Sequence, residues 1–144
     1  MSKSIVIAAA DTTNVQATSV TPSWILAGKP ETRAQQLSRS KDRNSYTMAW
    51  DCTAGNFNWY YSLDETLVVL EGEAFIKSDG LAERRIGAGD VVFFPAGCSA
   101  TWRVTNYIRK VAFLRHPIPP PIGFGVRAWN ALVRVVLGRQ QGGL

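Results

Sequence analysis

Residues 57–72 read FNWYYSLDETLVVLEG and carry the clearest signal of the fold. The second half of this stretch is a run of apolar residues, which favours a β-strand. The Glu71-Gly72 pair then interrupts the run, and a second run follows at residues 73–77. Because glycine accepts the positive φ values that tight turns require, the pair predicts a β-hairpin between the runs at 66–71 and 73–77.

A second stretch, GAGDVVFFPAG at residues 87–97, also has turn residues on both sides of an apolar run. Its glycines and aspartate predict a turn and its four central apolar residues predict a strand. The proline ends that strand, because it lacks a backbone donor. Further apolar runs lie at 101–104 and 107–114. Runs that recur every roughly 8 to 10 residues, with turn residues between them, are typical of an all-β barrel or sandwich.

Both stretches resemble the motifs of the cupin superfamily, whose RmlC-like fold is a double-stranded β-helix, or jelly-roll barrel. Glu65 and Gly72 have the spacing that ends the first motif, and the glycines and proline of 87–97 have the spacing of the second. More narrowly, NWYY-x3-ET-x4-EG, FPAG, the later tryptophan and the Arg-Lys pair resemble single-domain cupins related to the (S)-ureidoglycine aminohydrolase cupin domain. The resemblance covers about residues 46–115 and implies a homodimer.

The chain lacks the histidines that usually hold a metal ion in the cupins it resembles. The resemblance aligns the two histidines of the first motif with Trp59 and Tyr61, and the histidine of the second with Ala100. Among the usual ligands only Glu65 remains, and an indole offers a divalent ion no lone pair. We therefore expect no metal cofactor, although Tyr61, Glu65 and the two cysteines leave an atypical divalent ion open.

Aromatic and acidic residues are expected to line the mouth of this barrel. Alternate residues of a strand face opposite sides of a sheet, so Trp59, Tyr61 and Glu65 would share the interior with Trp102. Such a mouth suits a flat or cationic polar molecule, bound by stacking, cation–π contact and a charge-assisted hydrogen bond. The alternative is that the two tryptophans only fill the space left by a metal ion and its histidines.

Glu65 needs a partner inside the barrel, because an unpaired buried carboxylate is costly. Arg109 or Lys110 can supply this partner, depending on which of them faces inward, and either can instead bind an acidic ligand. The predicted ligand-binding residues are Trp59, Tyr61, Glu65, Trp102, Arg109 and Lys110.

Two functions fit these residues. The first is a metal-free cupin dimer that binds a small polar metabolite in the aromatic mouth. The second is an enzyme of the aminohydrolase or isomerase type, in which Glu65 is the acid or base and Tyr61 is a proton donor or electrophile. The missing histidines weigh against metal-dependent hydrolysis but not against acid–base isomerisation. We favour binding, and whether the protein is an enzyme stays open.

Composition supports one folded domain and argues against two classes of partner. The 144 residues are 46% hydrophobic and 10% aromatic, which argues against disorder. The net charge is +5, but four arginines and no acid lie in residues 115–144, so the remainder is nearly neutral and has no basic face for nucleic acid. No run is long enough to span a membrane, and the apolar stretch at 5–10 is too short for a secretory signal. A cytoplasmic protein without integral membrane association is expected.

An arm and a tail flank the predicted barrel. We assign residues 1–45 to an N-terminal arm, 46–116 to the cupin barrel core, and 117–144 to a proline-rich linker and an amphipathic helix of about three turns, capped by Gly138. In the cupins that this chain resembles, such an arm often pairs with a second subunit. For the helix we favour packing onto the barrel or a partner subunit over a membrane surface, because it is short and has few cations.

Overall fold

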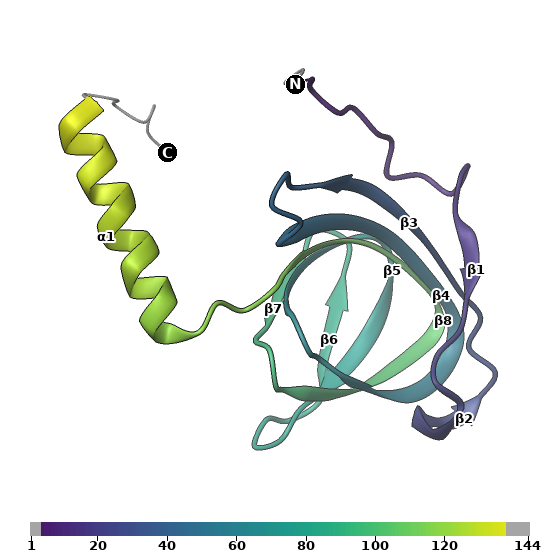
Figure 1. Ribbon diagram of the computed structural model, residues 1–144. Helices are drawn as coiled ribbons and strands as arrows, with labels where there is room; N and C mark the ends of the chain where they lie inside the picture. The colour runs from purple at the N-terminus through teal and green to yellow at the C-terminus, as the bar shows by residue number, and fades with distance from the viewer. Residues whose placement is uncertain (1–3, 138–144) are drawn as a thin grey trace.

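Residues 4–137 are described by the computed structural model, and they form eight strands, one 3₁₀ helix and one α-helix (Figure 1). The strands are β1 Gln16–Thr18, β2 Ile25–Gly28, β3 Thr32–Arg39, β4 Ser45–Tyr60, β5 Asp64–Lys77, β6 Arg84–Gly87, β7 Val91–Phe94 and β8 Ser99–Arg115. The 3₁₀ helix Pro22–Trp24 precedes β2, and the α-helix α1, Pro120–Leu137, follows β8. The predicted all-β jelly-roll barrel with a C-terminal helix is confirmed.

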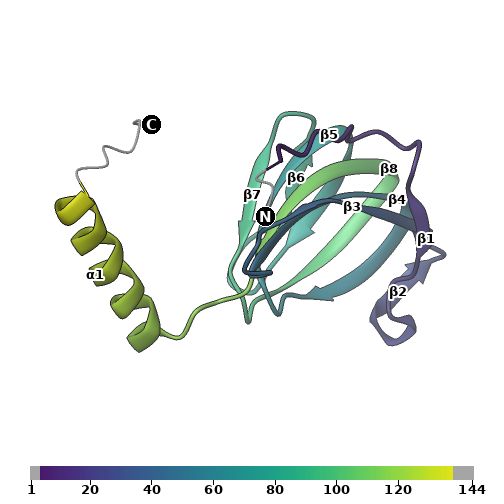
Figure 2. The ribbon, with the colours of Figure 1, turned by 45° about the horizontal axis from the view of Figure 1, so that its top comes forward.

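Three long strands, β4, β8 and β5, pair antiparallel in that order and form the centre of the barrel (Figure 2). The start of β5, at 65–68, pairs with β7, whereas its end, at 73–76, pairs with β6. In the same way β3 pairs with 46–52 of β4, and β2 pairs with 55–57. Each long strand therefore passes from one layer of the barrel into the other, and the core lies between the two layers.

The predicted hairpin at Glu71-Gly72 is wrong, because the chain continues through this pair as the single strand β5. β8 pairs with both predicted runs and so keeps them in one strand. Gly72 has φ +73°, and a Cβ there would lie 1.9 Å from the Tyr107 carbonyl oxygen. The glycine is thus required where two backbones approach closely at a bend, and not for a turn. The runs at 101–104 and 107–114 are likewise one strand, β8.

β4 also bends between the two layers, and this bend changes which side chains face inward. The register of its pairing with β8 shifts between Thr53 and Gly55, which is a β-bulge. At this shift one residue of β4, Ala54, lies opposite two residues of β8, Thr105 and Asn106, and the regular alternation of faces along β4 is interrupted. As a result Trp50 and Trp59 both pack against the core, although an odd number of positions separates them.

The core consists of apolar side chains from both layers of the barrel. Its largest fully buried members are Trp102, Phe57, Leu67 and Ile108. The rings of Phe57 and Trp102 are stacked with centroids 6.3 Å apart, so the layer containing the end of β4 is held by aromatic contacts.

Part of the predicted arm, residues 1–45, contributes a strand to the barrel. β3 pairs with β4 from Thr32 opposite Cys52 to Arg39 opposite Tyr46, and β1 pairs with β3 in turn. The sequence of β3, TRAQQLSR, is polar because one of its faces is largely accessible. Hydrophobic runs alone therefore do not reveal this strand.

α1 stands away from the barrel at the end of an extended linker (Figures 1 and 2). It begins at Pro120, earlier than predicted, because proline is tolerated in the first turn of a helix. With 18 residues it is longer than the three turns expected. The predicted cap, Gly138, lies outside the described residues. Over 4–137, no helix combines the length and apolar character needed to cross a membrane.

A candidate ligand site at the barrel mouth

Five of the six predicted site residues lie on the inner face of the barrel. Trp59 is at the end of β4, Tyr61 directly follows this strand, and Glu65 is at the start of β5. Trp102 and Lys110 come from β8, the strand that lies between the other two. All five side chains are buried or half-buried.

Glu65 and Lys110 form an ion pair inside the barrel. Lys110 Nζ donates to Glu65 Oε1 at 2.6 Å, and the two side chains are only 9% and 7% exposed, lysine first. The ammonium also lies 4.8 Å from the centroid of the Trp50 ring and 5.0 Å from that of Trp102. The interior therefore holds one negative and one positive charge, with two indoles over the cation.

Tyr61 is fixed by two aromatic neighbours. Trp102 Nε1 donates to the Tyr61 hydroxyl oxygen at 3.0 Å, and the Tyr61 ring is stacked on Phe94 with centroids 4.2 Å apart. Burial raises the pKa of the Tyr61 hydroxyl far above its usual value, and the charge of Glu65 adds to this shift. The hydroxyl is therefore neutral at physiological pH, and its own proton is available for donation.

A cavity of about 260 Å³ opens at this end of the barrel. Its walls include Trp24, Tyr46, Trp59, Tyr61, Glu65 and Leu114, and this set defines the barrel mouth. The Trp59 ring is half-buried and meets the Trp24 ring edge-on at 5.6 Å. The mouth thus brings the Glu65 carboxylate and the Tyr61 hydroxyl together within an aromatic wall.

Arg109, the sixth predicted residue, is not brought into this cluster. Neighbouring residues of β8 face opposite sides of the sheet, and the Arg109 side chain lies on the outer face. There it pairs with Glu71 at 3.2 Å and donates to the Ala10 carbonyl oxygen of the N-terminal segment. Of the two candidate partners for Glu65, the inward-facing one is Lys110.

The donor set of the mouth does not fit the metal ion that cupins usually hold. Trp59 and Ala100 offer no lone pair, Tyr61 already accepts from an indole, and the Lys110 ammonium contacts the carboxylate of Glu65. Within residues 4–137, no three His, Cys, Asp or Glu side chains group as ligands for a metal ion.

The surroundings of the two cysteines keep their thiols protonated. Cys52 is completely buried in the core, where burial raises the pKa of its thiol to about 12. Burial also raises the pKa of the half-buried Cys98 thiol. Both thiols are therefore protonated at physiological pH, the form that binds metal ions poorly.

Aromatic residues of the site that were not predicted include Trp24, Tyr46, Trp50 and Phe94. Strict alternation from Trp59 places Trp50 on the outer face, but the alternation of β4 is interrupted at the register shift with β8 between Thr53 and Gly55, and Trp50 packs against the core. Phe94 is the last residue of the FF pair before the proline, and its pairing with Glu65 places it on the inner face. Its place could have been found by alternation in β7, whereas that of Trp50 could not.

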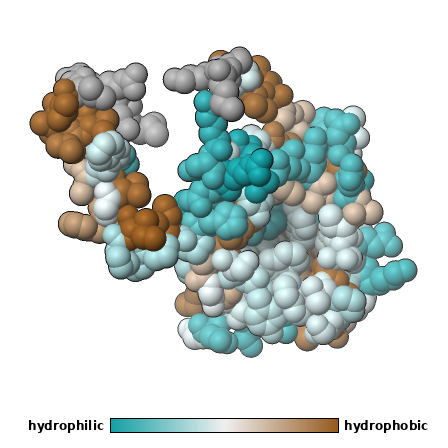
Figure 3. Space-filling view, viewed as in Figure 1, coloured by the Kyte–Doolittle hydropathy of each residue, from teal (hydrophilic) through white to brown (hydrophobic). Residues whose placement is uncertain are grey.

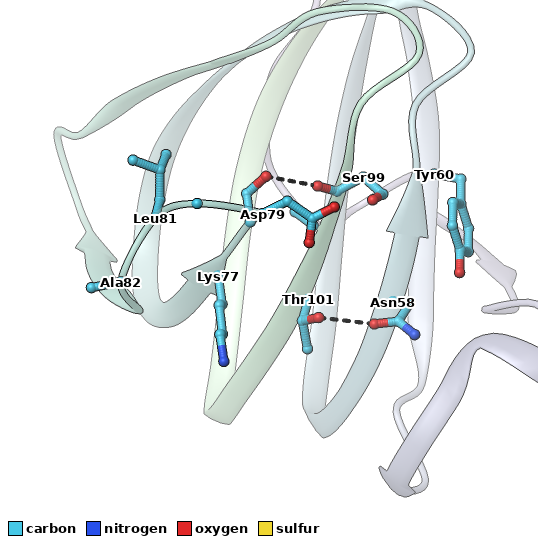
Figure 4. Close-up of a pocket in the computed structure, with 11 residues that line it drawn as sticks. Asn58, Tyr60, Lys77, Asp79, Leu81, Ala82, Ser99 and Thr101 are labelled. Carbon is cyan, nitrogen blue, oxygen red and sulfur yellow. Dashed lines mark hydrogen bonds between the residues drawn. The ribbon is translucent and has the colours of Figure 1, made fainter.

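A larger hollow, of about 660 Å³, lies on the outer face of the barrel (Figure 4). Its floor is a polar row across three strands, in which Thr101 donates to Asn58 at 2.9 Å and lies beside Lys77. The loop that carries Asp79 forms one wall. None of the six predicted residues lines this hollow.

Comparison with protein families assigns the fold to a known group. The Cupin_3 family model, which describes the EutQ-like cupin domain, matches residues 39–112, just over half of the chain. No curated protein matches the chain. The resemblance to cupins read from the two sequence motifs is confirmed, while the narrower relation to ureidoglycine aminohydrolase is not shown.

Solved structures with low sequence identity have the same fold. A Pseudomonas syringae pv. tomato protein of unknown function from the DUF861 family is 21% identical, with a TM-score of 0.65 over 72% of this chain. The present chain spans only 45% of that protein. The EutQ protein of Clostridium difficile is 19% identical, with a TM-score of 0.54 over 69% of this chain and 81% of its own. A putative ethanolamine utilization protein Q of Salmonella typhimurium is 21% identical, with a TM-score of 0.54 over 73% and 98%.

Proposed function

The chain belongs to the EutQ-like cupin family, and we propose that its barrel mouth binds a small polar molecule without the aid of a metal ion. The observation that carries this proposal is the buried Glu65–Lys110 pair below a mouth cavity of about 260 Å³. In this proposal the ammonium supplies the positive charge that a metal ion supplies in other cupins, while the aromatic wall supplies contact area.

The charge balance of the interior favours a neutral ligand. Lys110 already neutralises Glu65, so a cationic ligand would compete with an ammonium that has two indole contacts and a 2.6 Å hydrogen bond. A neutral group that both donates and accepts can instead bond to the carboxylate and to the Tyr61 hydroxyl. Amide, ureido and hydroxyl groups have this property, and Trp59 offers an aromatic surface for a flat one.

The narrower similarity noted in the sequence agrees with a ureido or amide ligand. The NWYY, ET and EG residues that carry it include Trp59, Tyr61 and Glu65, which belong to the proposed site. We further propose a homodimer, on the basis of the cupin resemblance.

Catalysis is the second candidate, because a carboxylate and a neutral phenol line the same cavity. Such a pair can move a proton between two positions of a bound molecule, with Glu65 as base and Tyr61 as proton donor. This chemistry is an isomerisation or a related proton transfer. It needs no metal-activated water.

Calorimetric titration with small neutral amides, ureido compounds and polyols tests the binding proposal. We expect one class to bind, and we expect Trp59→Ala and Glu65→Gln to weaken it at least tenfold, because a charge-assisted hydrogen bond contributes about 1.5–3 kcal/mol. Arg109→Met is the matched control and should bind as the wild type does. Failure of every class to bind, or equal binding by Trp59→Ala, would overturn the proposal.

Mass spectrometry of the bound compound after incubation separates binding from catalysis. An unchanged compound supports the binding function. Conversion by the wild type that is lost in Tyr61→Phe, at a concentration of the compound that saturates the variant, assigns the enzymatic function instead.

A further inference from the structure

α1 has an apolar surface much wider than that of a helix that packs on one protein surface. At 3.6 residues per turn, Arg127, Asn130 and Arg134 fall on one narrow stripe. Apolar residues occupy the remaining arc of roughly 240°, whereas a surface helix of a globular protein has an apolar stripe of about 100°. Most of this arc is open to solvent, with prominent members Phe124, Val126, Trp129, Leu132, Val135 and Val136.

Nothing in the barrel covers this arc. Figure 3 shows hydrophobic side chains gathered along the helix, while the barrel surface beside it is largely hydrophilic or neutral. Phe124 is 68% exposed, Val136 68% and Val126 42%, and at about 100° per residue Val136 lies roughly 120° from Phe124 and roughly 80° from Val126 around the helix axis. An exposed apolar surface of this extent marks an interaction site, since isolated apolar residues alone would not line most of a helix.

The charges of the tail are all of one sign. From residue 117 to the C-terminus the sequence contains arginines and no acidic residue. Arg127 and Arg134 are both exposed and lie on the polar stripe, so the only charges that the helix presents are positive. This stripe is complementary to an anionic surface.

We propose that α1 binds the surface of a lipid bilayer that contains anionic lipids, and lies in the plane of the interface. Its apolar arc would enter the boundary between headgroups and acyl chains, with Arg127 and Arg134 at the phosphates. Trp129 has the amphipathic ring that is enriched at this depth of a membrane. The helix is about 27 Å long, and crossing the bilayer would place its two arginines in hydrocarbon, whereas lying flat leaves both in water.

A lipid surface fits the helix better than a second copy of the chain does. A partner helix or sheet covers one stripe and would leave most of the roughly 240° arc in water. On a second copy of the chain, the surface that could receive the helix is the pair Phe93 and Phe113 on the outer face of the barrel, which are 59% and 50% exposed. Two copies of α1 would also bring like charges together. Binding of the helix to a second copy is the alternative that the experiments below distinguish.

Co-sedimentation of the full chain with vesicles tests the proposal. We expect strong binding to phosphatidylcholine vesicles that contain phosphatidylglycerol, weak binding to phosphatidylcholine alone, and a decrease with added salt. The double variant Arg127→Gln/Arg134→Gln should bind the anionic vesicles roughly 25-fold more weakly, at about fivefold for each cation. The matched control Lys29→Gln/Lys41→Gln removes two exposed charges from outside the helix and should bind as the wild type does.

A second variant separates the apolar contribution from the charges. Leu132→Glu/Val136→Glu should abolish vesicle binding while leaving the thermal midpoint of the barrel unchanged, because the helix stands apart from the barrel. Equal binding to both kinds of vesicle, or none to either, would overturn the proposal. A dimer seen by light scattering that both glutamates abolish, without vesicle binding, would assign the helix to a second copy. Ligand binding at the mouth is independent of these variants, so the two proposals fail separately.

Discussion

The two faces of β8 place neighbouring basic residues in opposite surroundings. Lys110 is almost completely buried, with one carboxylate and two indoles around its ammonium. Arg109 lies on the outer face, where its partner Glu71 is 59% exposed. If one partner of the inner pair is removed, water cannot reach the remaining charge to solvate it, whereas water can do so for the outer pair. Breaking the inner ion pair should therefore lower the free energy of unfolding strongly, and breaking the outer one should lower it little.

The largest effect is expected from Lys110→Met. This change leaves Glu65 buried without a counter-ion, so it should lower the free energy of unfolding by about 3–5 kcal/mol in urea denaturation at neutral pH. The double variant Lys110→Met/Glu65→Leu removes both charges and should recover most of this loss. A single variant within about 1 kcal/mol of the wild type would mean that the pair is solvated and would end the distinction between the two faces.

A smaller loss is expected from Tyr61→Phe. The phenylalanine keeps the stacking on Phe94 but removes the oxygen that accepts from Trp102 Nε1. A buried N–H without an acceptor costs about 1–3 kcal/mol, which urea denaturation monitored by tryptophan fluorescence can measure. As a control on the outer, exposed side of the same strand end, Tyr60→Phe should change stability by less than about 0.5 kcal/mol. Equal effects would contradict the buried hydrogen bond.

Stability should fall in alkaline solution because of Cys52 on the inner face. Burial raises the pKa of its thiol in the folded protein to about 12, above the usual value that the unfolded chain has. The folded state therefore keeps a proton that the unfolded state loses. The contribution of this group is complete below about pH 8.5 and is lost as the pH rises toward 12, by at most about 1.4 kcal/mol per pH unit.

Denaturation curves at pH 8, 9 and 10 measure this slope. Cys52→Ala should make the free energy of unfolding depend less steeply on pH. Its stability should also be lower than that of the wild type at every pH, because the buried sulfur is lost. Cys98→Ala is the comparison, because Cys98 is less buried than Cys52. If the slope of Cys52→Ala equals that of the wild type, the thiol is not responsible for the alkaline loss.

The smallest effect is expected from Arg109→Met. The Glu71 side chain of this pair is exposed to solvent, and such ion pairs contribute about 0–1 kcal/mol to the free energy of unfolding. The same denaturation assay should place this variant within 1 kcal/mol of the wild type. A loss comparable to that of Lys110→Met would show that the outer face contributes as much as the interior.

Local sequence signals predicted several strands of this barrel but not where they bend. The apolar runs and the glycines and proline of 87–97 identified the all-β fold. Gly72 was assigned to a hairpin, because the sequence cannot reveal that β8 passes within van der Waals distance of it. β3 was placed in the arm because its residues are polar. Both features depend on contacts between distant segments, which local patterns do not record.

Alternation within a strand predicted part of the site and failed at the bulge. An even spacing separates Trp102 from Lys110 on β8, so the choice of Lys110 over Arg109 could have been made from the sequence. The bulge after Thr53 cannot be read from the sequence, and it moved Trp50 to the inner face. The set of aromatic residues around the ammonium was therefore incomplete before the structure was known.

Metal analysis combined with native mass spectrometry of the untagged protein tests the central claim most directly, because it reports a bound ion and a retained small molecule together. The Glu65–Lys110 account predicts less than stoichiometric metal, with the protein either free or carrying a small neutral metabolite. A divalent ion present at one per chain and lost in Glu65→Gln would contradict it, since the carboxylate would then serve a metal ion and not Lys110.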